Sequence, residues 1–249
     1  MGGTDKWENE YVMKAITRVS GVAKGDMAPY LSDVIGQLNT VLSAVCGNPR
    51  NPSFNHYMFE TVASLIKFGC EADPALAAQF EAHMDRFEQD ENLWVGIVCS
   101  SHPKVFCAGA DLKAIGSGVP LATFRGGFAG FVSYPRRKPM IAAVDGFALA
   151  GGCEIVLACD MCISSESSKF GVPEVKRSLV AAAGGLFRLP QKIPKVVAME
   201  MILTGDPISA TRAYELGFVN QIVPKGQSLE AAIKLAERIT VNAPLAVRE

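Results

Sequence analysis

Two glutamates lie 20 positions apart in otherwise apolar sequence. Glu154 precedes the run Ile155–Ala158, and Glu174 follows Pro173. Singly, a glutamate at a helix start is explained by the helix dipole, and one after a proline by exposure in a loop. Together they suggest chemistry, because two carboxyl groups in a small apolar space cannot both ionise easily and one acquires a raised pKa. Such a pair can hold one water between an acid and a base.

Two stretches of small residues could bring bare backbone close to a ligand. They are Phe106-Cys-Ala-Gly-Ala-Asp-Leu-Lys113 and Ala148-Leu-Ala-Gly-Gly-Cys-Glu154. The second leads into a predicted helix, whose first turn presents unpaired N–H groups and a partial positive charge. Two such N–H groups can stabilise an oxyanion that develops on a thioester. Alone, the first stretch is equally a plain strand-to-helix turn.

In order and spacing, these stretches and Phe170–Glu174 resemble the crotonase (enoyl-CoA hydratase/isomerase) superfamily, and the resemblance covers residues 73–249. It implies an α/β fold built as a repeated β-β-α spiral. It also implies that the backbone N–H groups of Ala108 and Gly151 are the oxyanion donors, with Glu154 and Glu174 as the acid–base pair. Ala150 stands where most members have glycine, and we expect this added methyl group to be tolerated.

The same resemblance implies substrate contacts and a reaction. The backbone of Ala110, Asp111 and Leu112 would hold the CoA adenine, and Gly152 would join the substrate-binding residues. Members that keep both glutamates are typically hydratases, so we expect water to add to a 2-enoyl-CoA. No metal or separate cofactor is implied, because CoA arrives as part of the substrate. The alternatives are a carnitinyl-CoA-type dehydratase, an enoyl-CoA isomerase or a non-catalytic truncated fusion; a homotrimer or hexamer is also implied.

Periodicity predicts the elements that must position these residues. A helix beginning near Asp73 carries the stripe Leu76, Phe80, Met84 and Phe87. Short apolar runs predict strands, and amphipathic or small-residue patterns predict helices. The strands are expected at 94–99, 140–144, 161–164 and 218–223, and the helices at 193–203, 210–216 and 229–241.

Two further segments leave their roles open. Residues 117–135 are glycine-rich and contain Phe124, Phe128 and Phe131. These phenylalanines could line an acyl pocket or pack a helix, and the sequence favours neither. The basic triplet Arg136-Arg-Lys138 could meet CoA phosphates, but a solvated turn is the preferred interpretation.

The first 72 residues have a different character. Three helical patterns follow one another without strands, which is typical of an α-solenoid. The words at 7–18 and 48–60 resemble the exportin-2 family of HEAT-repeat transport receptors. We therefore predict two domains, a helical segment over 1–72 and a crotonase-like domain over 73–249, in a chimeric chain. The second would lack the family's opening strands and final helices, which would leave a sheet edge unpaired and weaken activity and oligomerisation.

Composition and charge bear on the partners and the location of the protein. The 249 residues carry a net charge of −1, which gives no electrostatic reason to expect nucleic-acid binding. No apolar run reaches membrane-spanning length, and the N-terminus lacks a signal-peptide core. The seven cysteines lie mostly in apolar stretches, as buried free thiols do, and predict a reducing, cytoplasmic location. Cys159-Asp-Met-Cys162 is interpreted as core sequence, not as a metal site.

Overall fold

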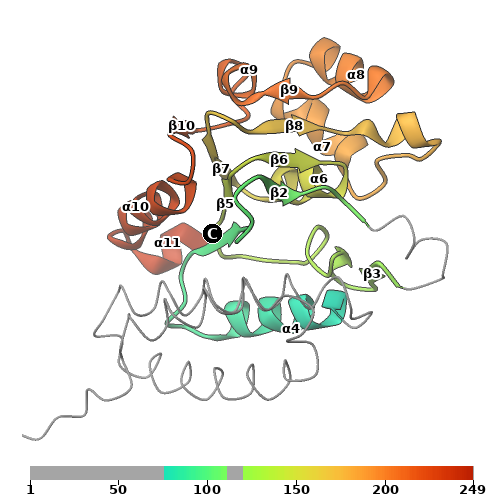
Figure 1. Ribbon diagram of the computed structural model, residues 1–249. Coiled ribbons are helices and arrows are strands. Elements are labelled where there is room, and N and C mark those ends of the chain that lie inside the picture. The colour runs from blue at the N-terminus through green and yellow to red at the C-terminus, as the bar shows by residue number, and fades with distance from the viewer. Residues whose placement is uncertain (1–75, 111–119, 249) are drawn as a thin grey trace, which may run out of the picture. The chain divides into compact units, whose positions relative to one another are not determined.

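The computed structural model describes residues 76–110 and 120–248 (Figure 1). The chain divides into two compact units, Met1–Leu76 and Ala77–Glu249. The boundary expected between residues 72 and 73 stays a prediction. The helices expected over 7–72, the Asp73 cap, Asp111 and Leu112 lie outside the described residues.

Two four-stranded sheets form the frame of the unit Ala77–Glu249. The first is parallel, in the order β1 (Gly96–Cys99), β5 (Met140–Val144), β7 (Met161–Ser165) and β10 (Gln221–Val223). The second has the order β2 (Val105–Cys107), β6 (Phe147–Leu149), β8 (Lys169–Gly171) and β9 (Ile208–Ser209), with only β9 antiparallel. Apart from a small separate hairpin, the strands from β1 to β8 alternate between the two sheets, as in the α/β spiral that the sequence predicts.

Helices and one small hairpin complete the unit. The hairpin joins β3 (Ala122–Thr123) to β4 (Gly127–Phe128). The helices are α4 (Leu76–Gln89), α6 (Gly151–Ala158), the 3-10 helix η2 (Pro173–Arg177), α7 (Gly185–Lys192), α8 (Lys195–Thr204), α9 (Ala210–Glu215), α10 (Ser228–Thr240) and α11 (Pro244–Arg248). Those predicted at 193–203, 210–216 and 229–241 are present within two residues of their expected ends. The strand expected at 218–223 is shorter, because Phe218 and Val219 are buried in the core before β10 begins.

The strand β5 separates two apolar clusters. Ile141 and Ala143 belong to the cluster with Ala232 of α10, whereas Ala142 and Val144 belong to the larger core. This alternation follows from the period of two along a strand. Figure 1 shows α10 beside the β5–β7 layer and α9 beside β9. The predicted stripe of α4 is also confirmed in part, since Met84 is buried and the Phe80 ring centroid lies 5.4 Å from that of Phe131.

The basic triplet is not a solvated turn. Lys138 is only 2% exposed, and its Nζ donates to the carbonyls of Phe87 and Asp90 at the C-terminal end of α4. The Arg136 guanidinium donates to the carbonyl of Ala158 at the end of α6. Cations placed there satisfy the carbonyls that a helix end leaves unpaired. Only Arg137, whose side chain is 73% exposed, fits the interpretation made from sequence.

The expectation that Cys159 and Cys162 belong to the core is confirmed. Both thiols are free and buried, and burial raises the pKa of Cys159 to about 12. Across the described ranges no group of three or more metal-binding side chains converges. Among the helices of the described residues, none has the length and apolar character needed to cross a bilayer.

Candidate active site

Three parallel strands bring the candidate residues to one edge of the second sheet. In the register of β2, β6 and β8, Cys107 lies opposite Ala148, and Leu149 opposite Gly171. The strands therefore end side by side. Their continuations carry Ala108, the start of α6 and Glu174, so segments distant in sequence converge. Ligands commonly bind beyond the carboxyl ends of parallel strands.

The two small-residue turns touch each other. Gly109 has φ +94°, and a Cβ built on it would lie 2.8 Å from the Cβ of Ala150 and 3.1 Å from the backbone nitrogen of Gly151. Only glycine combines that conformation with that proximity. The two predicted oxyanion donors thus belong to adjoining turns. Ala108 is exposed, Ala110 is half-buried, and Gly151 is buried.

The start of α6 is shaped by tight backbone packing. A methyl group on Gly152 would overlap the carbonyl oxygen of Cys107, and one on Gly151 would overlap the ring of Phe128. Gly152 therefore lets α6 approach β2, which is a packing role beside the predicted substrate-binding one. Phe128 lies over Gly151, whereas Phe131 is fully buried and Phe124 is fully exposed. The three phenylalanines thus have three different environments, and Phe128 alone lies against a candidate donor.

Ala150 adopts a conformation that usually belongs to glycine. Its φ is 51° and its ψ is −128°, and its N–H donates to the Gly171 carbonyl at 2.9 Å. An L-residue in such a conformation costs on the order of 1–3 kcal/mol. The expectation of tolerance considered only the volume of the methyl group. The structure places the cost of alanine in the backbone.

The Glu154 carboxyl is held by the start of α7, a contact that the sequence analysis did not predict. The residue is 3% exposed, and its Oε1 accepts a hydrogen bond of 2.9 Å from the N–H of Gly185, at the start of α7. Burial raises the pKa of Glu154, and the N–H groups of Gly185 and Ala183 and the charge of Arg188 oppose that rise. The ionised form thus has three compensating partners in a dry setting.

Glu174 has fewer partners. It lies in η2, and its buried Oε2 has no hydrogen-bond partner among the described residues. Burial raises the pKa of Glu174, repulsion from Glu154 raises it further, and only its own N–H opposes the rise. Both carboxyls also add to the burial that raises the pKa of Cys153 to about 12. A buried polar atom without a partner calls for an explanation, and a bound ligand or water is one.

Sequence reasoning missed the support given by α7. It gave no role to Gly184, Gly185 or Arg188. Gly184 has φ +120° and leaves room for the Arg188 guanidinium, which donates to the carbonyls of Val132 and Ala183 at 2.6 and 3.1 Å. Two glycines followed by an arginine in the first helical turn were the available signal. Their target, Glu154, lies 31 residues away and was not visible in that pattern.

Comparison with known proteins assigns families to two parts of the chain. Residues 72–249 match the family described as "Enoyl-CoA hydratase/isomerase", and residues 3–89 match that described as "CAS/CSE protein, C-terminus". The two matches overlap over 72–89, which contains α4. Within the unit Ala77–Glu249, α4 packs through Met84 into the main core.

Individual relatives give the scale of the similarity. The chain is 41% identical over 165 residues to a carnitinyl-CoA dehydratase of Proteus mirabilis, covering 65% of this chain and 63% of the relative. Its fold is similar to a carnitinyl-CoA hydratase from Mycobacterium avium (46% identity, TM-score 0.68) and to an enoyl-CoA hydratase from Mycobacterium marinum (49%, 0.68). Each structural alignment covers 71% of this chain and 69% of the other. The chain thus spans less than two thirds of the curated relatives it matches.

Proposed function

The chain belongs to the enoyl-CoA hydratase/isomerase family, and on that premise we propose that it adds water to a 2-enoyl-CoA thioester, giving a 3-hydroxyacyl-CoA. One observation carries the proposal above the others. Two carboxyl groups with raised pKa values interact beside a helix N-terminus, and one of them keeps a buried oxygen without a partner. A water that reacts with a conjugated thioester needs such a pair.

The different environments of the carboxyls suggest different roles. Glu154 has three groups that favour its ionised form, so it is the better base to take a proton from water. Glu174 has one such group and faces the repulsion of Glu154, so it is the better acid to give a proton to the α-carbon. Sharing the roles in this way lets both act at one pH. The proton of Glu174 adds to the α-carbon, and the hydroxyl group of the water adds to the β-carbon. Glu154 keeps the other proton of that water, and proton exchange with solvent restores both carboxyls.

The adjoining turns supply the remaining element of the proposal. As the nucleophile adds, negative charge develops on the thioester oxygen. We assign its stabilisation to the N–H groups of Ala108 and Gly151, because Gly109 and Ala150 hold these turns in contact. Ala110, Asp111 and Leu112 are proposed to contact the adenine of CoA, and Gly152 to shape the substrate site. CoA enters as part of the substrate.

Carnitinyl-CoA dehydration is the second candidate, favoured by the similarity to the Proteus mirabilis dehydratase. Elimination of water from a 3-hydroxyacyl thioester is the reverse of hydration and uses the same two carboxyls. Crotonyl-CoA and carnitinyl-CoA supplied separately would distinguish the candidates. Loss of the enoyl thioester's ultraviolet absorbance reports hydration, and its appearance reports dehydration. No turnover of either compound by the folded chain would instead favour a non-catalytic fusion protein.

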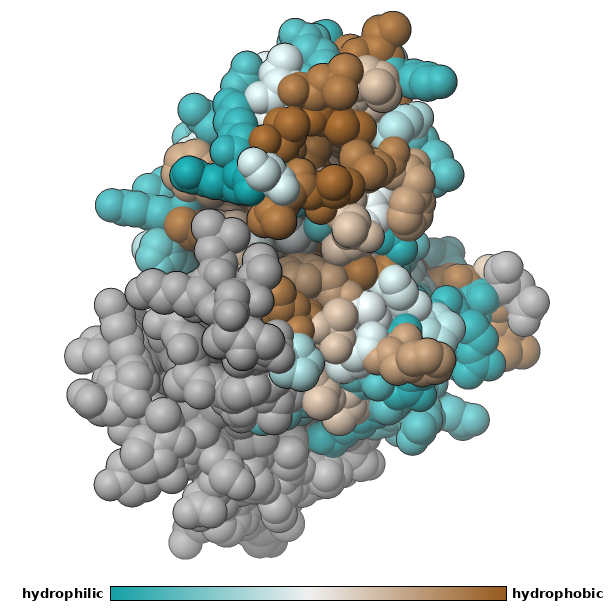
Figure 2. Space-filling model, turned by 90° about the vertical axis from the view of Figure 1, so that its right-hand side faces the viewer, coloured by the Kyte–Doolittle hydropathy of each residue, from teal (hydrophilic) through white to brown (hydrophobic). Residues whose placement is uncertain are grey.

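An exposed apolar surface supports the proposed self-association. Figure 2 shows apolar residues gathered over η2, α7 and α8. Several are large and open, with exposed fractions of 78% for Val196, 66% for Leu203 and 55% for Phe187. Contiguous apolar surface of this kind commonly marks an interface. We propose a homotrimer or hexamer, which light scattering after size-exclusion chromatography would test; a monomer at micromolar concentration would contradict it.

We propose further that residues 1–72 are a helical segment related to exportin-2, joined to the crotonase-like domain in a chimeric chain. The match of residues 3–89 to the CAS/CSE family supports this origin. Far-ultraviolet circular dichroism of the full chain, compared with a chain that begins at Asp73, would measure the helix that the segment contributes.

A further inference from the structure

A second concave region lies at the opposite end of α6 from the small-residue turns. This cleft has a volume of about 670 Å³ and lies at the amino-terminal ends of β5 and β7, where Pro139 and Asp160 precede the strands. Because α6 has eight residues, it separates the cleft from the oxyanion turns by about 12 Å. We call it the basic cleft. Its charged lining residues are Arg136, Arg137, Lys138, Arg188, Arg248 and Asp160.

The lining carries a large excess of positive charge. Among the lining residues that the structure describes, the single acidic side chain is Asp160, which lies 3.7 Å from Arg136 in an ion pair. Arg137 pairs with Glu88, also at 3.7 Å. Arg136 adds to the burial that lowers the pKa of Arg188, so these two guanidinium groups repel each other. A negatively charged ligand between them would relieve that repulsion.

Two of the cations are fixed before any ligand arrives. The Arg136 guanidinium carbon lies 5.3 Å from the centre of the Phe131 ring while the group caps α6. Arg188 is held by the carbonyls of Val132 and Ala183. Each guanidinium has five N–H donors, so these contacts leave donors for an anion. Preorganised donors spare much of the ordering entropy that binding otherwise costs.

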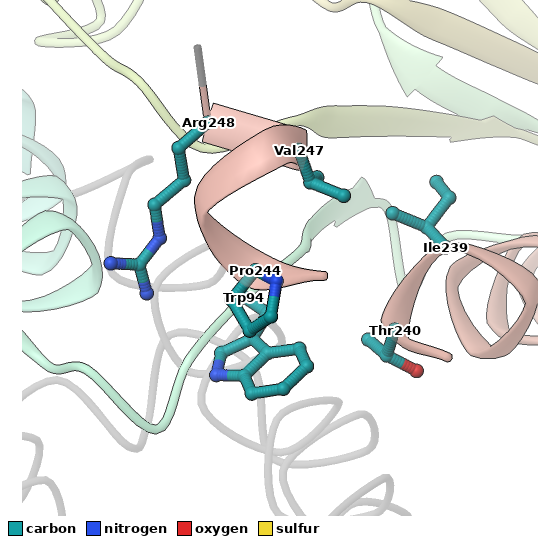
Figure 3. A pocket seen from close by; sticks show the side chains of 6 residues that line it. All are labelled: Trp94, Ile239, Thr240, Pro244, Val247 and Arg248. Atoms are coloured by element: carbon teal, nitrogen blue, oxygen red, sulfur yellow. The ribbon is translucent and has the colours of Figure 1, made fainter. Parts of the chain in front are cut away.

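The other two arginines are less constrained. The Arg137 side chain is largely exposed. Figure 3 shows Arg248 among the residues that line the small apolar pocket around Trp94, with its side chain extending away from Ile239 and Thr240. Arg248 also lines the basic cleft, where it adds to the burial that lowers the pKa of Lys138. The cleft thus combines two fixed guanidinium groups with two that can adjust.

We propose that the basic cleft binds a small phosphate-bearing anion, at a site separate from that of the thioester. Guanidinium groups match phosphate oxygens in planar, two-point geometry, which favours phosphate over halide. The volume exceeds that of a single phosphate and is suited to a pyrophosphate or nucleotide. The site also faces the chemistry, because Arg188 electrostatically stabilises ionised Glu154. An anion bound to Arg188 would weaken that stabilisation, an effect that rests on the proposed function.

Calorimetric titration of the full chain with inorganic pyrophosphate, at constant ionic strength, tests the proposal. We expect saturable binding that weakens at least about tenfold in the double variant Arg137→Gln/Arg248→Gln. The control is Arg238→Gln, which removes an exposed arginine from α10, outside the cleft lining, and should bind like the parent chain. No saturable heat, or equal weakening in the control, would overturn the site.

Two further titrations identify the ligand and the separateness of the site. ADP that binds more tightly than pyrophosphate would indicate a nucleotide, and equal affinity would indicate the phosphate groups alone; both support the cleft. Free CoA should bind the Arg137→Gln/Arg248→Gln variant as tightly as the parent chain, because the thioester site lies elsewhere. A loss of CoA affinity equal to the loss for pyrophosphate would overturn the claim of a separate site, because the cleft would then receive the phosphates of the thioester substrate. These readouts measure binding only, so they stand even if the hydration assay fails.

Discussion

The two ends of α6 differ in how far their polar groups are satisfied. At the C-terminal end, Arg136 donates to the Ala158 carbonyl and Lys192 donates to those of Cys159 and Asp160. The Asp160 carboxylate accepts from the Met140 N–H at 2.7 Å. At the N-terminal end, Ala150 holds an unfavourable φ and Glu174 keeps an orphan oxygen. The polar groups at the C-terminal end of α6 are therefore satisfied, whereas the N-terminal end has a strained backbone and lies near an unpartnered carboxyl oxygen. Strain and unmet hydrogen bonds concentrate where function is exercised.

Replacing either carboxyl group near the N-terminal end of α6 should have the largest effect, which is on catalysis. Glu154→Gln or Glu174→Gln keeps the shape of the side chain but cannot transfer the proton. We expect kcat for crotonyl-CoA hydration to fall about 100-fold or more, with KM changing little. Near-parental kcat in either variant would remove that residue from the mechanism.

Removing the guanidinium group that caps the C-terminal end of α6 should instead lower stability. Arg136→Met keeps an apolar stem but leaves the Ala158 carbonyl without its side-chain partner. We expect a loss of about 1–3 kcal/mol in the free energy of unfolding, measured by urea denaturation. The matched control is Arg137→Met, whose exposed side chain should change stability by less than about 0.5 kcal/mol. If the two variants lose equal stability, the cap at the end of α6 contributes nothing special.

The pH dependence of stability sharpens the comparison further. A carboxyl group whose folded pKa is raised binds its proton more tightly in the folded state, so stability falls as pH rises from the ordinary value of 4.5 through the raised one. Glu174→Gln cannot ionise and should escape this loss. We expect the variant to melt higher than the parent at neutral pH and at the same temperature near pH 4. A gap that stays constant with pH would contradict a raised pKa for Glu174.

The smallest effect is expected at Ala150. Ala150→Gly should relieve the unfavourable φ but add freedom to the unfolded chain, and the net gain should be about 1 kcal/mol. A rise of a few degrees in Tm would show it. A control at an ordinary helical position, Ala198→Gly in α8, should lower Tm. A fall in Tm for Ala150→Gly would mean that the backbone is not strained there.

Much of this architecture could be predicted from the sequence, because the spacing of apolar residues in long runs indicates the type of element and its buried face. The helix α10 and the strand β5 were both anticipated. The strands of the second sheet were not individually anticipated, because three residues such as Phe147–Leu149 are too few to show a period of two. The basic triplet was misjudged for a related reason. A charged residue is usually expected to be exposed. Only the tertiary structure shows that Lys138 donates hydrogen bonds to the carbonyls at the end of α4.

The support of Glu154 could not be read from sequence either. It depends on the backbone N–H of Gly185. Every residue except proline has such a group, so the sequence does not indicate which one will meet Glu154. The contact of Phe128 with Gly151 is equally a product of folding, since the two lie in a hairpin and a helix that local patterns do not connect. The site residues themselves remain a prediction until variants are measured.

The placement of α7 also ties the two carboxyls together mechanically. Glu174 lies in η2, and the chain leads through residues 175–184 directly to Gly185, whose N–H holds Glu154. One short span of backbone thus carries the proposed acid at one end and the anchor of the proposed base at the other. A displacement of this span would therefore move the proposed acid and the anchor of the proposed base together. On the proposed mechanism, such a movement would change both proton transfers at once.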